Sequence, residues 1–203
     1  MPRLLLVRHG QSEWNAAGRW QGQADPPLSD LGRLQARAAG ATIGAVDAIV
    51  ASPLERAHRT ALAISEAVGV GPVTVDPDLA ERHAGEWQGL TRAQIDEQYP
   101  GYLDDTGEGR RRPPGWEHDD VLLERVLRAL GRIATDLAGA DDVVAVTHGG
   151  VIYAVERHLG ADFARIPNLG ARWVAIDGDR LTLGERLLLI DPDEVLVTSP
   201  GQI

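Results

Sequence analysis

The chain has 203 residues and a formal net charge of −10. That length suits one domain with a substantial core, so we expect a single domain over residues 1–203. The negative charge disfavours nucleic acid and anionic membranes as partners. Neither cysteine nor lysine occurs, which excludes disulfides, thiolate metal sites, thiol nucleophiles, Schiff-base lysines and a P-loop lysine.

The hydropathy of the chain gives no sign of a membrane or export segment. No stretch reaches the roughly 18 uninterrupted apolar residues of a membrane span, and the apolar run after Met1 is shorter than the hydrophobic region of a signal peptide. We therefore expect a cytoplasmic protein with no membrane partner. Its oligomeric state is open, with a homodimer as one alternative.

Short apolar and β-branched runs alternate with segments of helical periodicity along the chain. The expected strands span residues 4–7, 46–51, 73–75, 143–147, 172–177 and 180–190. The expected helices span residues 29–43, 53–69, 91–98, 119–138 and 149–159. Such alternation predicts an α/β fold, a three-layer αβα sandwich with a mostly parallel sheet and helices on both faces. A hairpin-type Asp-Gly-Asp turn at residues 177–179 predicts an antiparallel edge strand.

The first expected strand ends in polar residues suited to chemistry. Residues 4–7 form an apolar run typical of a strand buried on both faces, and Arg8, His9 and Gly10 follow directly. Ligands of open α/β sheets bind beyond the carboxyl ends of the strands. Arginine offers a planar fork for phosphate or carboxylate, and neutral histidine is a nucleophile or a base. This segment therefore predicts a functional site at that edge of the sheet.

A second expected strand ends in the same way. Residues 143–147 are β-branched and apolar, and His148 and Gly149 follow them at the start of a helical pattern. Between the two histidine motifs, residues 52–55 (Ser-Pro-Leu-Glu) are typical of a capping box with proline at the first helical position. Arg56 then lies in the first turn, where the unpaired N–H groups and the helix dipole also favour an anion.

A carboxylate follows the third expected strand, residues 73–75. Glu81 lies in a loop punctuated by Gly85 and Gly89, a kind of segment that connects elements over the surface and carries functional side chains. The segment therefore adds the carboxylate of Glu81 to the candidate site.

Residues 99–118 break both periodicities and predict a long loop of the kind that forms lids or binding loops. Within it, Arg110, Arg111 and Arg112 form a cationic triplet, which is either a solvated segment or a guide for an anionic substrate. Tryptophans near the motifs are either packing residues or stacking platforms for a sugar: Trp14, Trp20, Trp87 and Trp116.

Four ordered motifs resemble the histidine phosphatase superfamily, also called phosphoglycerate-mutase-like, from residue 4 to about residue 160. They are Arg8-His9-Gly10, the Ser-Pro-Leu-Glu-Arg-Ala run at residues 52–57, Glu81 in Leu-x-Glu-x-x-x-Gly-x-Trp-x-Gly, and Thr147-His148-Gly149. The Arg-His-Gly-Gln-Ser-Glu sequence is similar to branch 1, which holds phosphoglycerate mutases and small-molecule phosphatases. Residues 85–96 are similar to those of glucosyl-3-phosphoglycerate phosphatases.

This resemblance implies a phosphomonoesterase that needs no metal and no cofactor and hydrolyses a small sugar- or glycerate-type phosphate ester. It implies a phosphohistidine formed on His9, with Glu81 as proton donor to the leaving oxygen. Arg8, Arg56 and His148 would grip the phosphoryl oxygens. The other implied substrate-binding positions are Asn15, Gln21, Gly22 and Gly149.

In-line attack requires a neutral His9 imidazole, so its second ring nitrogen should donate to a backbone carbonyl. His148 should carry a proton beside a bound dianion.

The chain departs from the family pattern at several places. Mutases usually have Ser-His-Gly-Asn where residues 147–150 read Thr-His-Gly-Gly, and they carry a longer insertion over the site, which favours hydrolysis here. Many relatives have arginine where Ala80 stands, beside the acidic residue. Mutase-type phosphoryl transfer is the nearest alternative function, and a non-catalytic phosphate-ligand sensor is another. A zinc hydrolase is disfavoured because no histidine pair has close ligand spacing.

Overall fold

The computed structural model describes residues 2–104, 111–178 and 180–193. Six strands form one sheet in the order β3-β2-β4-β1-β5-β6. The pairs β3–β2, β2–β4 and β4–β1 are parallel, whereas β5 and β6 add an antiparallel edge. The strands are β1 (Arg3–Arg8), β2 (Ala48–Ala51), β3 (Thr74–Val75), β4 (Asp142–Thr147), β5 (Gly170–Asp177) and β6 (Arg180–Leu188).

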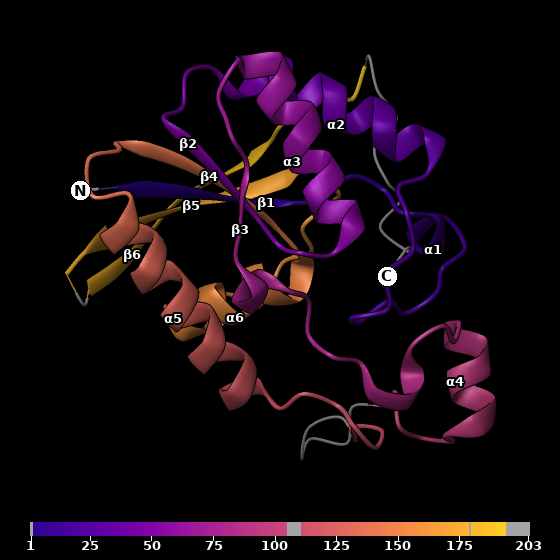
Figure 1. The fold of residues 1–203 in the computed structure, drawn as a ribbon. Coiled ribbons are helices and arrows are strands. Elements are labelled where there is room, and N and C mark those ends of the chain that lie inside the picture. The colour runs from indigo at the N-terminus through magenta and orange to yellow at the C-terminus, as the bar shows by residue number, and fades with distance from the viewer. Residues whose placement is uncertain (1, 105–110, 179, 194–203) are drawn as a thin grey trace.

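Helices cover both faces of this sheet, with α2 and α3 on one face and α5 and α6 on the other (Figure 1). The predicted three-layer αβα architecture is therefore confirmed. The helices are α1 (Glu13–Ala16), α2 (Asp30–Ile43), α3 (Glu55–Val68), α4 (Arg92–Gln98), α5 (Asp119–Asp136) and α6 (Gly149–His158), with 3₁₀ turns η1 (Pro77–Leu79) and η2 (Gly85–Trp87).

The central strands are apolar throughout because both of their faces are buried. In β1, Leu4 and Leu6 join the core under α5 and α6, whereas Leu5 and Val7 join the core under α2 and α3. Burying each such side chain contributes about 1.5–3 kcal/mol. Two cores that share one strand hold the end of β1 rigidly, which suits it to position a functional residue.

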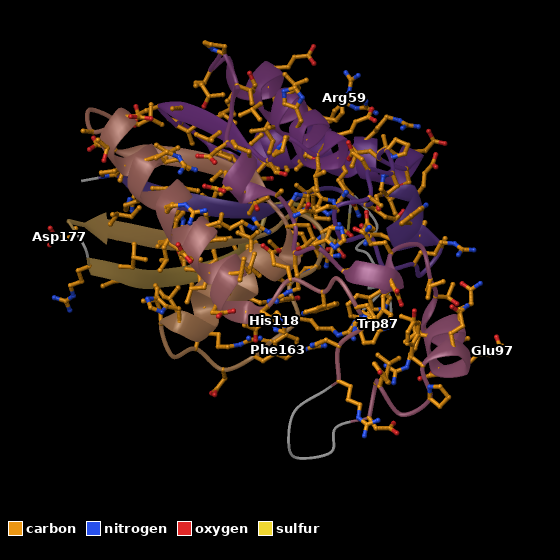
Figure 2. The ribbon with its side chains drawn as sticks, turned by 60° about the horizontal axis from the view of Figure 1, so that its bottom comes forward. Arg59, Trp87, Glu97, His118, Phe163 and Asp177 are labelled. Carbon is orange, nitrogen blue, oxygen red and sulfur yellow. The ribbon has the colours of Figure 1, made fainter. Side chains whose placement is uncertain are left out.

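The register of β1 and β4 brings their carboxyl ends together. Arg8 pairs with Thr147 in the parallel ladder, so His9 and His148 leave neighbouring strands at the same level. A small lobe around α4 lies beyond this end of the sheet, and its core contains Trp87, Ile95 and Leu103. Figures 1 and 2 both show this lobe at the end of the molecule opposite Asp177, where the antiparallel strands turn.

The start of α3 differs from the predicted capping box. The helix begins at Glu55 after Leu54, which makes no side-chain cap hydrogen bond, and Pro53 precedes the helix. The hydroxyl of Ser52 accepts from the N–H of Leu54 at 3.3 Å, before the helix begins, and it also contacts the ring of His148. Arg56 still lies in the first turn, as the sequence predicts.

Among the described residues, no helix combines the length and the apolar character needed to cross a bilayer.

Candidate active site

His9 is buried at the end of β1 in one defined tautomer. Its Nδ1 lies 2.7 Å from the carbonyl oxygen of Gly10, to which only a protonated nitrogen can donate. Its Nε2 accepts a hydrogen bond of 3.2 Å from Nε of Arg56, so this nitrogen carries a lone pair. Burial, followed by the charges of Arg56 and Arg8, holds the pKa of His9 well below its usual value. The imidazole is neutral at physiological pH, as the sequence analysis requires.

Hydrogen bonds from other segments hold the backbone around His9. Its N–H donates to Thr147 on β4, and its carbonyl accepts from the Asn168 side chain at 2.7 Å. The next residue, Gly10, donates its N–H to Thr60 on α3 at 3.0 Å. The backbone position of His9 is therefore set by contacts from several different elements.

Arg56 is completely buried at the start of α3. Its two terminal nitrogens donate to the carbonyls of Ala24 and Gly22, at 2.9 and 2.8 Å. Burial lowers its pKa to about 10, while nearby Glu81 and Asp25 oppose that shift. Because a pKa of about 10 still leaves the guanidinium charged at neutral pH, Arg56 supplies a fixed positive charge beside His9.

His148 faces His9, with ring centroids 5.1 Å apart. Its Nε2 lies 2.8 Å from the Ser52 hydroxyl, and its Nδ1 is buried without a hydrogen-bond partner among the described residues. Burial, followed by the charge of Arg56, holds its pKa well below the usual value. His148 is thus neutral in the free protein, and an anion that contacts Nδ1 would favour its protonation.

Arg8 directs a second guanidinium at the same place. Its terminal nitrogen donates to the Ile166 carbonyl at 2.7 Å, and its buried Nε has no partner within the described segments. Burial lowers its pKa, while the nearby side chains of Tyr153 and Glu81 oppose that shift. A Cβ added to Gly149 would lie 3.9 Å from Nε of Arg8, so the start of α6 adjoins this arginine.

Glu81 reaches the same cluster from the connection between η1 and η2. Its Oε1 accepts from the N–H of Arg82 at 2.7 Å, and its Oε2 accepts from the N–H of Gly150 at 3.2 Å. Its charge affects the pKa of both Arg8 and Arg56, which places the carboxylate within electrostatic reach of the two cations. A Cβ at Gly150 would overlap Oε1 of Glu81, so glycine is needed for this approach.

The remaining predicted binding residues lie on the loop that follows β1. Asn15 is buried on α1 and Gln21 is nearly so, and both accept hydrogen bonds from Ser12. Gly22 contributes its carbonyl to Arg56. The structure places this loop against the cluster through Asn168, whose side chain contacts both Asn15 and the His9 carbonyl.

The loop tryptophans mainly pack on one another. Trp20, Trp87 and Trp116 make edge-to-face contacts with centroids 5.2–5.9 Å apart, and Trp87 is fully buried. Arg112 lies over the Trp116 ring and Arg111 over Tyr102, so both arginines cover the aromatic lobe. Arg110 lies outside the described residues.

Several residues that were not predicted as site residues contact the cluster. Ser52 contacts His148, Asn168 holds the His9 carbonyl, and the carbonyl of Glu81 accepts from Gln23 and Arg125. Ser52 has two signals in the sequence, because it begins one of the four motifs and directly follows β2. The other contacts join segments that only the folded chain brings together.

The cluster combines two guanidinium groups, two neutral imidazoles and one carboxylate. Buried cations and unpaired nitrogens of this kind bind a phosphate or another small dianion. No group of three His, Cys, Asp or Glu side chains arranged to hold a metal ion occurs in the described parts of the chain.

Comparison with known proteins identifies relatives over most of the chain. The model of the histidine phosphatase superfamily (branch 1) matches residues 4–188. A glucosyl-3-phosphoglycerate phosphatase of Mycolicibacterium vanbaalenii is 40% identical over 190 residues, which cover 87% of this chain and 84% of the relative. A metal-independent phosphoserine phosphatase of Arabidopsis thaliana is 38% identical over 159 residues, 75% of this chain and 66% of that protein.

A solved structure agrees with these relatives. The mycobacterial glucosyl-3-phosphoglycerate phosphatase in complex with VO3 superposes with a TM-score of 0.77 at 31% identity. The match covers 91% of this chain and 98% of that structure.

Proposed function

Because the chain belongs to the histidine phosphatase superfamily and is a phosphatase, we propose that it hydrolyses a small sugar- or glycerate-type phosphate ester through a phosphohistidine on His9. The observation that carries this proposal is the tautomer of His9. With Nδ1 bonded to the Gly10 carbonyl, Nε2 presents its lone pair beside Arg56 and His148. A relative that acts on glucosyl-3-phosphoglycerate and another that acts on phosphoserine support a small, polar substrate.

In the first step, Nε2 of His9 attacks phosphorus in line with the bond to the ester oxygen, and that bond breaks. Arg8, Arg56 and a protonated His148 hold the three equatorial oxygens, where charge accumulates. The N–H of Gly149 and the side chains of Asn15 and Gln21 complete the phosphate site. The phosphoryl group thereby moves to His9.

Glu81 delivers its proton to the leaving ester oxygen, so that an alcohol and not an alkoxide departs. Such general acid catalysis contributes typically ~10²- to 10⁴-fold. In the second step the Glu81 carboxylate takes a proton from water as the water oxygen attacks phosphorus. The N–P bond then breaks, and inorganic phosphate and free His9 result.

The proposal includes metal independence, because three cationic groups are available to balance the dianion without an added ion. Full activity in the presence of a chelator is the expected result, and loss of activity that a divalent cation restores would contradict it. Cytoplasmic location, the homodimer and the absence of nucleic-acid binding stay predictions of the sequence.

The decisive experiment compares His9→Ala with His158→Ala, an exposed histidine at the end of α6. The substrate panel includes glucosyl-3-phosphoglycerate, phosphoserine and 3-phosphoglycerate. His9→Ala should abolish hydrolysis of every ester and the trapping of a phosphoenzyme, while His158→Ala retains both. Turnover by His9→Ala would overturn the proposed nucleophile. With a bisphosphoglycerate primer, interconversion of phosphoglycerates faster than phosphate release would favour the mutase alternative.

A further inference from the structure

Arg125 on α5 directs three hydrogen bonds to the segment that carries Glu81 and two to Glu117. Its side chain is nearly buried, and an arginine has five N–H donors. One terminal nitrogen donates to the carbonyls of Asp78 and Ala80, at 2.7 and 2.6 Å. The other donates to the carbonyl of Glu81 at 3.0 Å and to Glu117 at 2.8 Å, and Nε donates to Glu117 at 2.7 Å.

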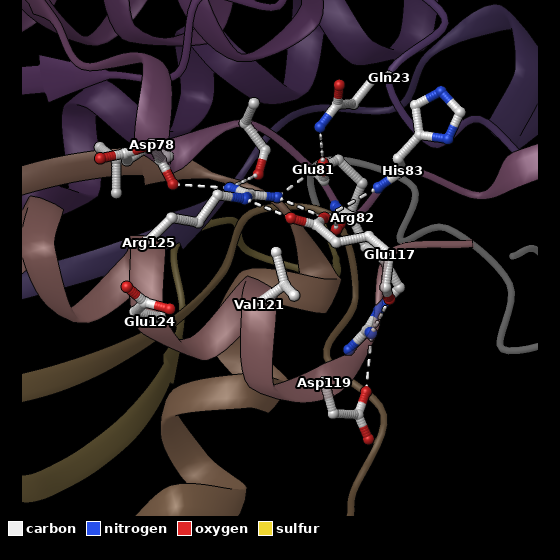
Figure 3. Close-up of polar contacts among 12 residues, drawn as sticks. Gln23, Asp78, Glu81, Arg82, His83, Glu117, Asp119, Val121, Glu124 and Arg125 are labelled. Atoms are coloured by element: carbon white, nitrogen blue, oxygen red, sulfur yellow. Dashed lines mark hydrogen bonds and ion pairs between the residues drawn. The ribbon is translucent and has the colours of Figure 1, made fainter. Parts of the chain in front are cut away.

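Glu117 links Arg125 by hydrogen bonds to the two residues that follow Glu81. Its carboxylate accepts from the N–H of His83, and its backbone carbonyl accepts from the side chain of Arg82. Burial disfavours ionisation of Glu117, but the hydrogen bond and charge of Arg125 outweigh it and hold its pKa below the usual value. Figure 3 shows Arg125 between Asp78 and Glu117, with a dashed line from its guanidinium to Glu81.

The backbone of Glu81 lies in neither a helix nor a strand, so the hydrogen bonds of regular secondary structure do not hold it in place. Ala80 has no side-chain donor, and among the described residues only Gln23, which is exposed, shares the Glu81 carbonyl with Arg125. The Glu81 carboxylate itself is held by two backbone N–H groups, from Arg82 and Gly150. Its place over the phosphate site therefore depends on the position of its own backbone.

We propose that Arg125 is a positioning residue for the acid step, which fixes the backbone of Glu81 so that the carboxyl group meets the leaving oxygen. This inference rests on the proposed role of Glu81 as proton donor. Displacement of a catalytic group by about 1 Å can cost on the order of 10²-fold in rate. We call the hydrogen bonds of Arg125 to Asp78, Ala80, Glu81 and Glu117 the Arg125 clamp. Loss of this clamp should therefore reduce kcat much more than it alters KM.

The experiment measures kcat and KM of Arg125→Gln and Arg125→Lys on an alkyl phosphate and on an aryl phosphate with an acidic phenol. The aryl ester needs little proton donation, so kcat/KM, which reports the steps up to release of the alcohol and not the later hydrolysis of the phosphohistidine, should fall at least about tenfold more on the alkyl ester than on the aryl ester. Lysine should not restore kcat, because one ammonium group cannot reproduce five donors in a fixed plane.

Arg132→Gln is the matched control. Arg132 lies on the same helix and bonds Asp76 and Asp78 through their carboxylates, without contact to Glu81. Arg132→Gln should lower the thermal midpoint and leave the alkyl-to-aryl ratio of kcat/KM unchanged. If the Arg125 variants do not fold, Glu117→Gln, which weakens the same clamp, is judged by the same ratio.

A Glu81→Gln background separates this inference from the proposed function. Glu81→Gln alone should lower the alkyl-to-aryl ratio, and adding Arg125→Gln should lower it no further. Equal loss on both esters for Arg125→Gln, with a selective loss for Glu81→Gln, would overturn the role of Arg125 alone. Equal loss on both esters for Glu81→Gln would remove the proposed acid itself.

Discussion

The ring centroids of His9 and His148 lie 5.1 Å apart in one buried cluster, but the two rings make different hydrogen bonds, which suit different chemical roles. The Nδ1–H group of His9 donates to the Gly10 carbonyl, which leaves a lone pair on Nε2. By contrast, Nδ1 of His148 has no hydrogen-bond partner among the described residues. Burial, followed by the charge of Arg56, lowers the pKa of both rings. The difference between a proposed nucleophile and a proposed phosphate ligand thus comes from hydrogen-bond partners and not from charge.

Gly150 provides a residue-scale test of the Glu81 position. In Gly150→Ala the new Cβ would overlap the end of the Glu81 side chain, which can rotate away at little cost in stability. We expect kcat to fall about 10²-fold while the thermal midpoint stays nearly unchanged. Gly139→Ala, which meets no atom within 4 Å, is the control and should retain activity. A fully active Gly150→Ala would show that Glu81 need not adopt this position.

At the scale of elements, the loop after β1 is held by the amino-terminal turn of α2. Ser29 donates its N–H to the Gln11 carbonyl, and the N–H of Gln11 donates to the side chain of Gln35. Gly32 permits this contact, because a Cβ there would overlap the backbone of Gln11. One close approach between a helix and a loop therefore sets the path of the residues that follow His9.

Replacing Gly32 by alanine tests this contact. We expect Gly32→Ala to lower the free energy of unfolding by about 1–3 kcal/mol, because the clash is with backbone, which cannot move aside easily. Gly131→Ala, in an exposed and open part of α5, should instead raise it by about 0.5–1 kcal/mol. Urea unfolding of both variants gives the comparison. Changes of the same sign would contradict the packing argument.

At the scale of the whole molecule, the chain carries a net charge of −10 but holds Arg56, fully buried, and Arg8, partly buried, at the carboxyl end of the sheet. Long-range repulsion disfavours anions in general. A ligand that reaches the end of the sheet meets Arg8 and Arg56 in a medium of low dielectric, where their charges act strongly. The two arginines therefore provide a local site for an anion on a chain that is acidic overall.

The two buried histidines also link stability to pH. Their pKa values are lower in the folded protein than the ordinary value of 6.5, so below pH 6.5 the unfolded chain binds protons that the folded protein excludes. The contribution of the two histidines to the free energy of unfolding should be fully present above pH 6.5. It should decrease as the pH falls from there towards the lowered pKa values. The slope should approach about 1.4 kcal/mol per pH unit for each histidine.

Urea unfolding between pH 7.5 and pH 5.5 measures this slope. The double variant His9→Gln, His148→Gln should lose it, whereas a variant of exposed His158 should keep it. Parallel stability curves for the original chain and the double variant would refute the linkage.

The sequence by itself determined the elements and the order of the motifs. The predicted strands and longer helices end within two residues of the observed ones, because apolar runs and 3.6-residue periodicity are local signals. The short helix α1 and the 3₁₀ turns carry no such signal and were not predicted. The family resemblance is confirmed by the match over residues 4–188. His9 and His148 could be assigned to neighbouring strand ends because parallel strands align their carboxyl ends.

Only the tertiary structure decided which side chains support the site. Ser52 reads as a helix cap along the chain, but folding places it against His148, 96 residues away. Arg125 reads as one more polar residue of an amphipathic helix, yet it binds the Glu81 carbonyl 44 residues before it. Hydrogen bonds between distant segments depend on which surfaces pack together, and local periodicity carries no information about that pairing.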